Sequence, residues 1–279
     1  MVRTPTSCSL PAHDSIRHLR KAGTLKVYIS VDIEGIAGIA HWDEALHDGP
    51  DYPAFRTLMT NEAIAACEGA ANAGADEIYV RDAHETARNL EIARLPSGVR
   101  VIRGWSGHPY KMIQELDDSF DALVMVGWHG PAADGGNPLS HTMTGTYANI
   151  TLNGAPLSEL GINALLAATH KVPVVFLSGD AAMCAQAQAI NPEMGVVETK
   201  YGHGASVISI TPAESCTRIR TGVEAALRTD FGSHALPASD HYVMELRFNH
   251  HELAYKRSFY PGADLIADDT IRIEADTIF

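Results

Sequence analysis

The sequence predicts an α/β protein with a mostly parallel sheet flanked by helices, followed by a smaller C-terminal α+β subdomain. Short apolar runs rich in Val and Ile recur along the first 200 residues, as expected for strands buried on both faces of a parallel sheet. Alanine-rich segments separate these runs, and strands that alternate with helices are typical of α/β domains. Beyond residue 240, apolar and polar residues alternate, which indicates strands with one solvated face.

The apolar runs and the helix-favouring segments define the expected elements. Strands are expected over residues 25–31, 77–80, 99–102, 122–126, 172–177 and 194–199. Helices are expected over residues 52–72, 159–168 and 181–189. Residues 141–152 alternate β-branched and other side chains up to Asn153-Gly154, a dipeptide that favours hairpin turns. We therefore expect a hairpin beside the main sheet.

Changes in composition divide the chain into three predicted parts. Residues 1–24 contain Pro, Ser and charged residues but no continuous apolar stretch of a secretory signal, so we expect a mobile N-terminal extension. Residues 25–210 are expected to form the α/β domain that carries the candidate site. Residues 211–279 are expected to form the smaller subdomain, with strands over 242–248 and 270–275.

The charge balance excludes one class of partner. The 279 residues include 21 Lys and Arg against 34 Asp and Glu, a formal net charge of −13. Nucleic-acid binding needs clustered basic residues that displace counterions from phosphates, and the sequence contains no such cluster. We therefore expect no nucleic-acid partner.

The cysteines and the hydropathy favour a reducing, aqueous compartment. The four cysteines are Cys8, Cys67, Cys184 and Cys216. They stand far apart without a C-x-x-C pair, which indicates neither a disulfide framework nor a thiolate zinc site. No uncharged apolar run approaches the ~20 residues that a membrane helix needs. We expect a cytoplasmic protein without a membrane partner.

Acidic residues and histidines follow the predicted strands. Asp32 and Glu34 are two residues apart in an extended segment, so their carboxylates share one side. Like charges this close repel unless a proton or a cation lies between them. His84 and His129 each end a separate strand, and Glu159 begins a predicted helix. In open α/β sheets the carboxyl ends of the strands meet at the ligand-binding edge, where these residues can converge.

This mixed set of nitrogen and oxygen ligands suits zinc or manganese in a hydrolytic site. Five ligands exceed the usual three of a mononuclear catalytic zinc, and the surplus fits two ions that share a carboxylate. Each residue taken alone has an ordinary structural role as well. An Asp after a strand often caps a helix, and some of the 14 histidines end strands by chance.

Two further charged residues allow two interpretations each. Glu62, on the helix expected over 52–72, either orients a metal-binding histidine or is a surface or capping charge. Lys200 follows the strand expected over 194–199, and it either binds a substrate carboxylate or is solvated.

Five segments in order resemble the motifs of the D-aminopeptidase family, peptidase family M55. They are Val31-Asp-Ile-Glu-Gly-Ile-Ala-Gly38, Val80-Arg-Asp-Ala-His84, Val126-Gly-Trp-His129, Leu139-Ser-His-Thr-Met143 and Ser158-Glu-Leu-Gly-Ile-Asn-Ala164. The resemblance extends from about Leu25 to the C-terminus and weakens after residue 200. The loop over 130–138 is about one residue longer than the family pattern.

The resemblance implies a two-zinc aminopeptidase, with manganese or cobalt as alternative metals, that acts on short peptides or aminoacyl amides, including those with D-residues. By the family pattern, Asp32 bridges both ions, Glu34 and His84 complete the shell of one ion, and His129 and Glu159 complete the shell of the other. His141 matches the catalytic histidine, as an acid–base or as a nucleophile. The family's ring-stacked decamers imply a homo-oligomer.

Other functions stay open at this point. A metal-dependent amidase that acts on a non-peptide amide, or a phosphoesterase, would use a similar two-metal centre. The sequence shows no obvious Lys or Arg clamp for a phosphate near the motifs. A non-enzymatic binding domain with a structural metal is a further alternative, although structural zinc sites are usually built with cysteine.

Overall fold

The computed structural model describes residues 24–231 and 239–278. The predicted extension over residues 1–24 therefore lies, apart from its last residue, outside the described residues. Within the described ranges, no helix is both long and apolar enough to cross a membrane.

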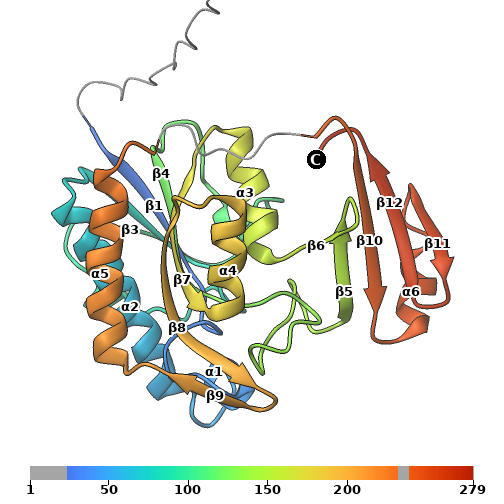
Figure 1. Ribbon diagram of the computed structural model, residues 1–279, viewed down its shortest axis with the longest axis horizontal. Helices are drawn as coiled ribbons and strands as arrows, with labels where there is room; N and C mark the ends of the chain where they lie inside the picture. The colour runs from blue at the N-terminus through green and yellow to red at the C-terminus, as the bar shows by residue number, and fades with distance from the viewer. Residues whose placement is uncertain (1–23, 232–238, 279) are drawn as a thin grey trace, which may run out of the picture.

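The larger of two sheets has seven strands in the order β3-β2-β1-β4-β7-β8-β9 (Figure 1). Its strands are β1 (Lys26–Val31), β2 (Glu77–Asp82), β3 (Arg100–Ile102), β4 (Ala122–Trp128), β7 (Val174–Asp180), β8 (Gly195–His203) and β9 (Ser206–Ser209). All neighbours are parallel except β8 and β9. The predicted fold class, with its mostly parallel sheet, is confirmed.

Helices cover both faces of this sheet, and alternate residues of the central strands form two cores. Val27, Ile29 and Val31 of β1 point into one core with α2 (Tyr52–Asn72) and α5 (Pro212–Arg228). The opposite face packs against α3 (Glu159–Thr169) and α4 (Ala181–Ile190). Burial on both faces explains why β4 is buried along its whole length and why the strands appear as continuous apolar runs in the sequence. The remaining short helical turns are α1 (Trp42–Ala45), η1 (Ile92–Arg94) and η2 (Lys111–Ile113).

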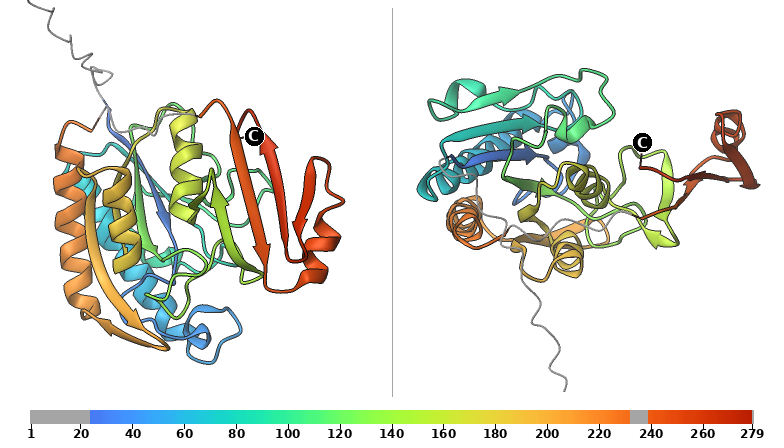
Figure 2. Two further views of the ribbon diagram at one scale, coloured as in Figure 1. Left: turned by 45° about the vertical axis from the view of Figure 1, so that its right-hand side comes forward. Right: turned by 90° about the horizontal axis from the view of Figure 1, so that it is seen from above.

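The second sheet is antiparallel, with the order β11-β12-β10-β5-β6, and it stands beside the layered part of the molecule (Figure 2). Its elements are β5 (Tyr147–Leu152), β6 (Ala155–Pro156), β10 (Tyr242–Phe248), β11 (Ala263–Ala267) and β12 (Thr270–Ala275), together with α6 (His251–Arg257). The predicted hairpin at Asn153-Gly154 is present. Its strand begins at Tyr147 rather than at residue 141, and it pairs with β10, about 90 residues later in the chain.

The layers do not divide at one point in the sequence. The α5 helix follows residue 210 but packs on α2 and the first sheet. The β5–β6 hairpin precedes residue 210 but belongs to the second sheet. The division into residues 25–210 and 211–279 remains a prediction about folding units.

The chain that leaves β1 crosses very close to the end of β4. A Cβ atom at Gly35 would lie 2.0 Å from the carbonyl oxygen of Trp128, so only glycine fits there. Asp32 N donates to Val126 O at 2.8 Å, and Gly35 N donates to Gly127 O at 2.8 Å. These contacts bring the segment with Asp32 and Glu34 beside the end of β4.

Two buried charged side chains support this segment from behind. Lys200 is 1% exposed, and its ammonium group donates to the carbonyl oxygens of Glu34 and Ile39. Neither sequence interpretation of Lys200 is correct, because its charge is used inside the protein. Glu62 Oε1 accepts hydrogen bonds from Ala37 N at 3.0 Å and from the Ser215 hydroxyl at 2.8 Å. Glu62 therefore holds the loop backbone.

The Glu62 carboxyl makes stability depend on pH. Burial raises the pKa of Glu62 from its ordinary value of 4.5 to about 7, so the folded protein favours the protonated form. The stabilisation by this proton is full below pH ~4.5 and is lost as the pH rises through ~7, by up to about 3 kcal/mol. Glu62→Gln keeps an acceptor and should remove this dependence. Urea unfolding at a series of pH values tests it, and parallel stability profiles for both proteins would contradict it.

Candidate metal centre

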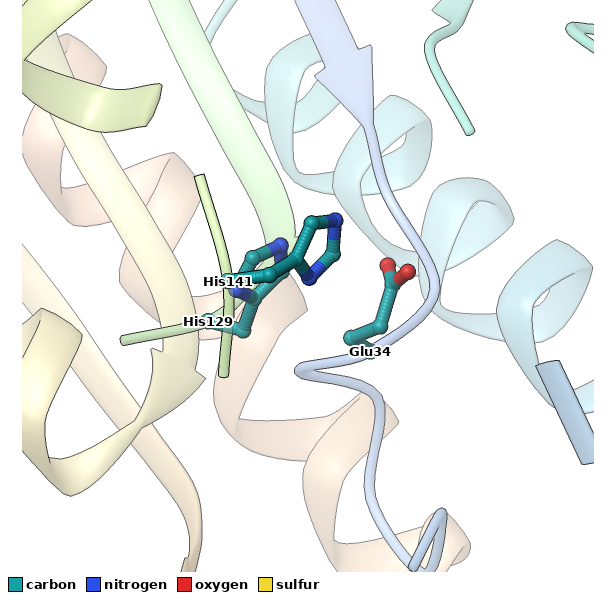
Figure 3. A group of neighbouring side chains, drawn as sticks. All are labelled: Glu34, His129 and His141. Carbon is teal, nitrogen blue, oxygen red and sulfur yellow. The ribbon is translucent and has the colours of Figure 1, made fainter. Parts of the chain in front are cut away.

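The five predicted metal-binding residues and His141 form one buried cluster at the carboxyl edge of the first sheet. Asp32 and Glu34 follow β1, and His84 follows β2. His129 follows β4, and Glu159 is the first residue of α3. Because β1, β2 and β4 run parallel, their carboxyl ends lie at the same edge of the sheet. In Figure 3, the Glu34 carboxylate faces the two histidine rings from the loop that leaves β1.

His84 lies against both carboxylates that follow β1. Its Nδ1 is 3.2 Å from Asp32 Oδ1 and 3.1 Å from Glu34 Oε2. Its Nε2 is 2.9 Å from the carbonyl oxygen of Ala45. A carbonyl only accepts, so Nε2 carries the hydrogen and Nδ1 is left to face the carboxylates. This second hydrogen bond is typical of metal-binding histidines.

His129 lies on the other side of Asp32. Its Nε2 is 3.6 Å from Asp32 Oδ2 and 3.6 Å from Glu159 Oε2. Its Nδ1 donates to the carbonyl oxygen of Gly130 at 2.9 Å. The two oxygens of Asp32 therefore face two different histidines, one on each side.

His141 comes from the long loop before β5 and is less buried than the other members, with 14% of its side chain exposed. Its ring stacks on the ring of His129, with centroids 4.3 Å apart. Its Nδ1 donates to Leu139 O at 2.9 Å, and its Nε2 is 3.6 Å from Glu159 Oε1. The ring of Trp42 also contacts the His141 ring in an edge-type arrangement, with centroids 5.4 Å apart. This arrangement fixes the ring and leaves Nε2 available.

Three buried atoms of the cluster lack a hydrogen-bond partner. They are Glu34 Oε2, His129 Nε2 and Glu159 Oε2. Buried polar atoms nearly always have partners, so these atoms indicate that a cation belongs between them. Two ligands of a tetrahedral zinc ion lie about 3.3–3.6 Å apart, and the four nitrogen–oxygen distances of His84 and His129 fall between 3.1 and 3.6 Å. The donor set therefore fits zinc.

The ligand atoms group into three possible sets. Each set has ligand atoms within 4.8 Å of one another, and the sets are Asp32–Glu34–His84, Asp32–His129–Glu159 and Glu34–His129–His141. The first two share Asp32 and match the partition implied by the family pattern. The third set admits His141 as a ligand, a role that the sequence interpretation did not include.

The charges of the cluster shift the pKa values of its members. Burial and the Glu34 charge raise the pKa of Asp32 to about 8. Burial disfavours the charged rings of His84 and His129, yet the carboxylates of Glu34 and Glu159, respectively, raise their pKa well above the ordinary value. The protein without metal therefore retains protons among these groups, in positions that bound dications would replace.

Two aspartates at other strand ends position the histidines. Asp82 accepts hydrogen bonds from the backbone of Asn89, whose side chain donates to His84 O at 2.7 Å. Asp180 accepts from Gly130 N at 2.7 Å and from Asn137 Nδ2 at 2.9 Å, next to His129. The sequence analysis did not identify either aspartate. Both end strands as Asp32 does, so position in the sequence does not separate a ligand from a support.

A cavity of about 560 Å³ opens onto the cluster. Its walls include the aromatic rings of Trp42 and Trp105, together with Leu46 and Met143. A cavity of this size, with an apolar wall and a few convergent polar groups, is typical of sites for small molecules.

A parallel sheet with a buried carboxylate–histidine cluster at its carboxyl edge defines the class of α/β metal-dependent hydrolases. Comparison with protein families gives the particular group. The model of the Peptidase_M55 family, described as D-aminopeptidase, matches residues 25–279. The chain belongs to the D-aminopeptidase family, as the motifs predict.

Two comparisons agree with this membership. A D-aminopeptidase of Bacillus subtilis strain 168 is 29% identical over 243 residues, which cover 86% of this chain and 88% of that protein. The solved structure of the zinc-dependent D-aminopeptidase DppA from Bacillus subtilis, a self-compartmentalizing protease, matches with a TM-score of 0.86 and 27% identity. That match covers 91% of this chain and 93% of the other.

Zinc binding should stabilise the protein through Asp32. We expect zinc to raise the melting temperature of metal-free protein, because a bound dication offsets the repulsion among buried carboxylates. A ligand at 1,000 times its Kd adds about 4 kcal/mol. Asp32→Asn should lose most of this response while the metal-free variant stays folded. Differential scanning calorimetry measures both.

His241→Ala provides the matched control for Asp32→Asn. His241 lies 2.9 Å from Asp276 and 3.4 Å from Glu274 in an exposed cluster of the second sheet, so its removal should leave the zinc response unchanged. An equal rise in melting temperature for Asp32→Asn and the wild type would exclude Asp32 as a ligand.

Proposed function

We propose that this protein is a two-metal aminopeptidase that binds zinc and removes the N-terminal residue of short peptides or aminoacyl amides, including D-residues. The observation that carries the proposal is the position of Asp32, whose two oxygens face two separate histidine–carboxylate pairs. A carboxylate in this position is suited to bridge two ions. Membership of the D-aminopeptidase family and the similarity to the zinc-dependent DppA support the choice of metal and reaction.

Each residue of the cluster has a proposed role. Asp32 holds both ions, Glu34 and His84 hold one, and His129 and Glu159 hold the other. When bound, the ions lower the pKa of water toward ~7 and polarise the scissile carbonyl group.

His141 is the proposed acid–base residue. The hydrogen bond from Nδ1 to Leu139 O fixes its ring, and Nε2 is available to donate to the oxyanion or to the leaving amine. The free amino group of the substrate needs a hydrogen-bond acceptor or a position on a metal ion, and the carboxylate of Glu85 lines the cavity outside the proposed ligand set. Trp42 and Trp105 provide apolar walls for the side chain that is removed.

We also propose that the protein acts as a homo-oligomer in the cytoplasm. The DppA relative is self-compartmentalizing. The α6 helix and the turn after it expose large apolar side chains, with Tyr255 61%, Phe259 72% and Tyr260 65% exposed, and exposed apolar patches mark protein–protein contacts. The decamer implied by the family remains a prediction.

Cleavage should require a free amino group. The experiment compares D- and L-alanyl dipeptides with a free or an acetylated amino group, on protein loaded with zinc, manganese or cobalt. We expect hydrolysis of the free peptides alone, because acetylation blocks the amine that would bind at the metal cluster. Equal cleavage of the acetylated peptides would indicate a general amidase. Failure to cleave any of them with any metal would refute the proposed function.

His141→Ala should lower kcat about 10²–10⁴-fold, the usual contribution of a general acid–base, without loss of zinc. Turnover assays and elemental analysis measure the two quantities. His203→Ala, at an exposed end of β8, is the matched control. Loss of a zinc equivalent in His141→Ala would make His141 a ligand, as the Glu34–His129–His141 set allows. Normal turnover would deny it any role.

A further inference from the structure

Lys111 is the only lysine or arginine that lines the cavity in the part of the chain that the structure describes. Lys111 shares this cavity with four acidic residues, which are Asp32, Glu34, Glu85 and Glu159. Among the described residues, no carboxylate lies within ion-pair distance of the Lys111 ammonium group. The charge of Lys111 is therefore unpaired, and Glu85 is the one acidic residue among these four outside the proposed metal-binding set.

The backbone around Lys111 is fixed to the strand that carries the metal ligands. Lys111 begins the η2 turn, and its neighbours Met112 and Ile113 are buried. The Ser30 hydroxyl donates to Met112 O at 2.8 Å, and the Tyr28 hydroxyl donates to Gln114 O at 2.6 Å. Ser30 and Tyr28 belong to β1, which leads directly into Asp32. The position of Lys111 relative to the cluster is therefore set by the core.

Lys111 also has an unusual backbone conformation. Its φ angle is +41°, in the left-handed region that residues other than glycine rarely adopt. Such conformations concentrate where a side chain is held for a ligand. Lys171 has a φ of +59° as well, but it follows the C-terminal end of α3, where left-handed residues commonly occur. Lys111 has no helix end before it that would explain its conformation.

We propose that Lys111 binds the terminal carboxylate of a short peptide substrate and so determines specificity for free peptides over C-terminally blocked ones. The proposal rests on the proposed aminopeptidase function. A short peptide carries a positive amino group at one end and a negative carboxylate at the other. In the loaded protein the amino-terminal end and the scissile bond would lie at the metal cluster, and Lys111 lines the same cavity with a positive charge for the carboxylate. A cavity of about 560 Å³ limits the distance between the two ends.

The cavity also accounts for the size of the substrate. A longer peptide would place its carboxylate outside the reach of Lys111 and would lose this contact. We therefore expect activity to decline as the peptide is extended at its C-terminus. The difference in kcat/KM between the free and the amidated forms should decrease in parallel. No basic clamp is visible near the motifs in the sequence, because Lys111 lies between two of them, 27 residues after His84 and 15 residues before Val126.

The test compares one dipeptide with its C-terminal amide on the zinc-loaded wild type and on Lys111→Met. A hydrogen bond to a charged group contributes enough for about a tenfold effect or more. We expect Lys111→Met to lower kcat/KM for the free dipeptide about tenfold, mainly through KM, and to change the value for the amide less than twofold. Lys111→Arg should retain the preference, and Lys111→Glu should reverse it in favour of the amide.

Lys171→Met is the matched control, because it removes the same side chain from the same backbone region at the opposite edge of the sheet. It should leave both substrates unaffected. An equal change in kcat/KM for the dipeptide and the amide in Lys111→Met, or no change for either, would overturn the proposal while leaving the aminopeptidase function intact. Failure of the wild type to cleave either substrate would instead refute the proposed function.

Discussion

The structure depends on the close approach of three buried carboxylates, Asp32, Glu34 and Glu159. Each is at most 3% exposed, and charges this close in the interior are costly unless cations or protons lie between them. His84 and His129 supply part of the compensation by holding protons in the metal-free protein. Two dications would supply it fully. The cluster is therefore a source of instability in the apo-protein that bound cations would offset.

The surrounding fold holds these groups in place against their repulsion. The central strands β1 and β4 are buried on both faces, and Gly35 lets the chain after β1 pass beside Trp128. Behind the cluster, Lys200 and Glu62 bind the backbone of the same loop rather than its carboxylates. The carboxylate oxygens of Asp32 and Glu34 are thus not occupied by these supports, while the backbone of the loop is held in place. The buried ionisable groups at the carboxyl edge of the first sheet thus fall into two sets. Lys200 and Glu62 hold the loop backbone, and the carboxylates of the cluster are left for a cation.

The sequence predicts the layered sheet and the location of the cluster because both follow from local patterns. The strands over 77–80 and 122–126, and the helix over 52–72, are visible as β-branched and helix-favouring segments. His84 and His129 follow the two strands. What depends on distant contacts is not visible. Lys200 is buried because two carbonyl groups more than 160 residues away accept its hydrogens. The pairing of β5 with β10 and the packing of α5 on α2 likewise join segments far apart in the chain.

Asp32 is the proposed bridge between two ions, and anomalous diffraction at the zinc edge from crystals of the zinc-loaded protein tests this role most directly. Two peaks are expected, about 3.5–4 Å apart as in other two-metal sites. One peak should lie between Asp32 Oδ1, Glu34 and His84, and the other between Asp32 Oδ2, His129 and Glu159. A single peak, or two peaks of which only one contacts Asp32, would contradict it.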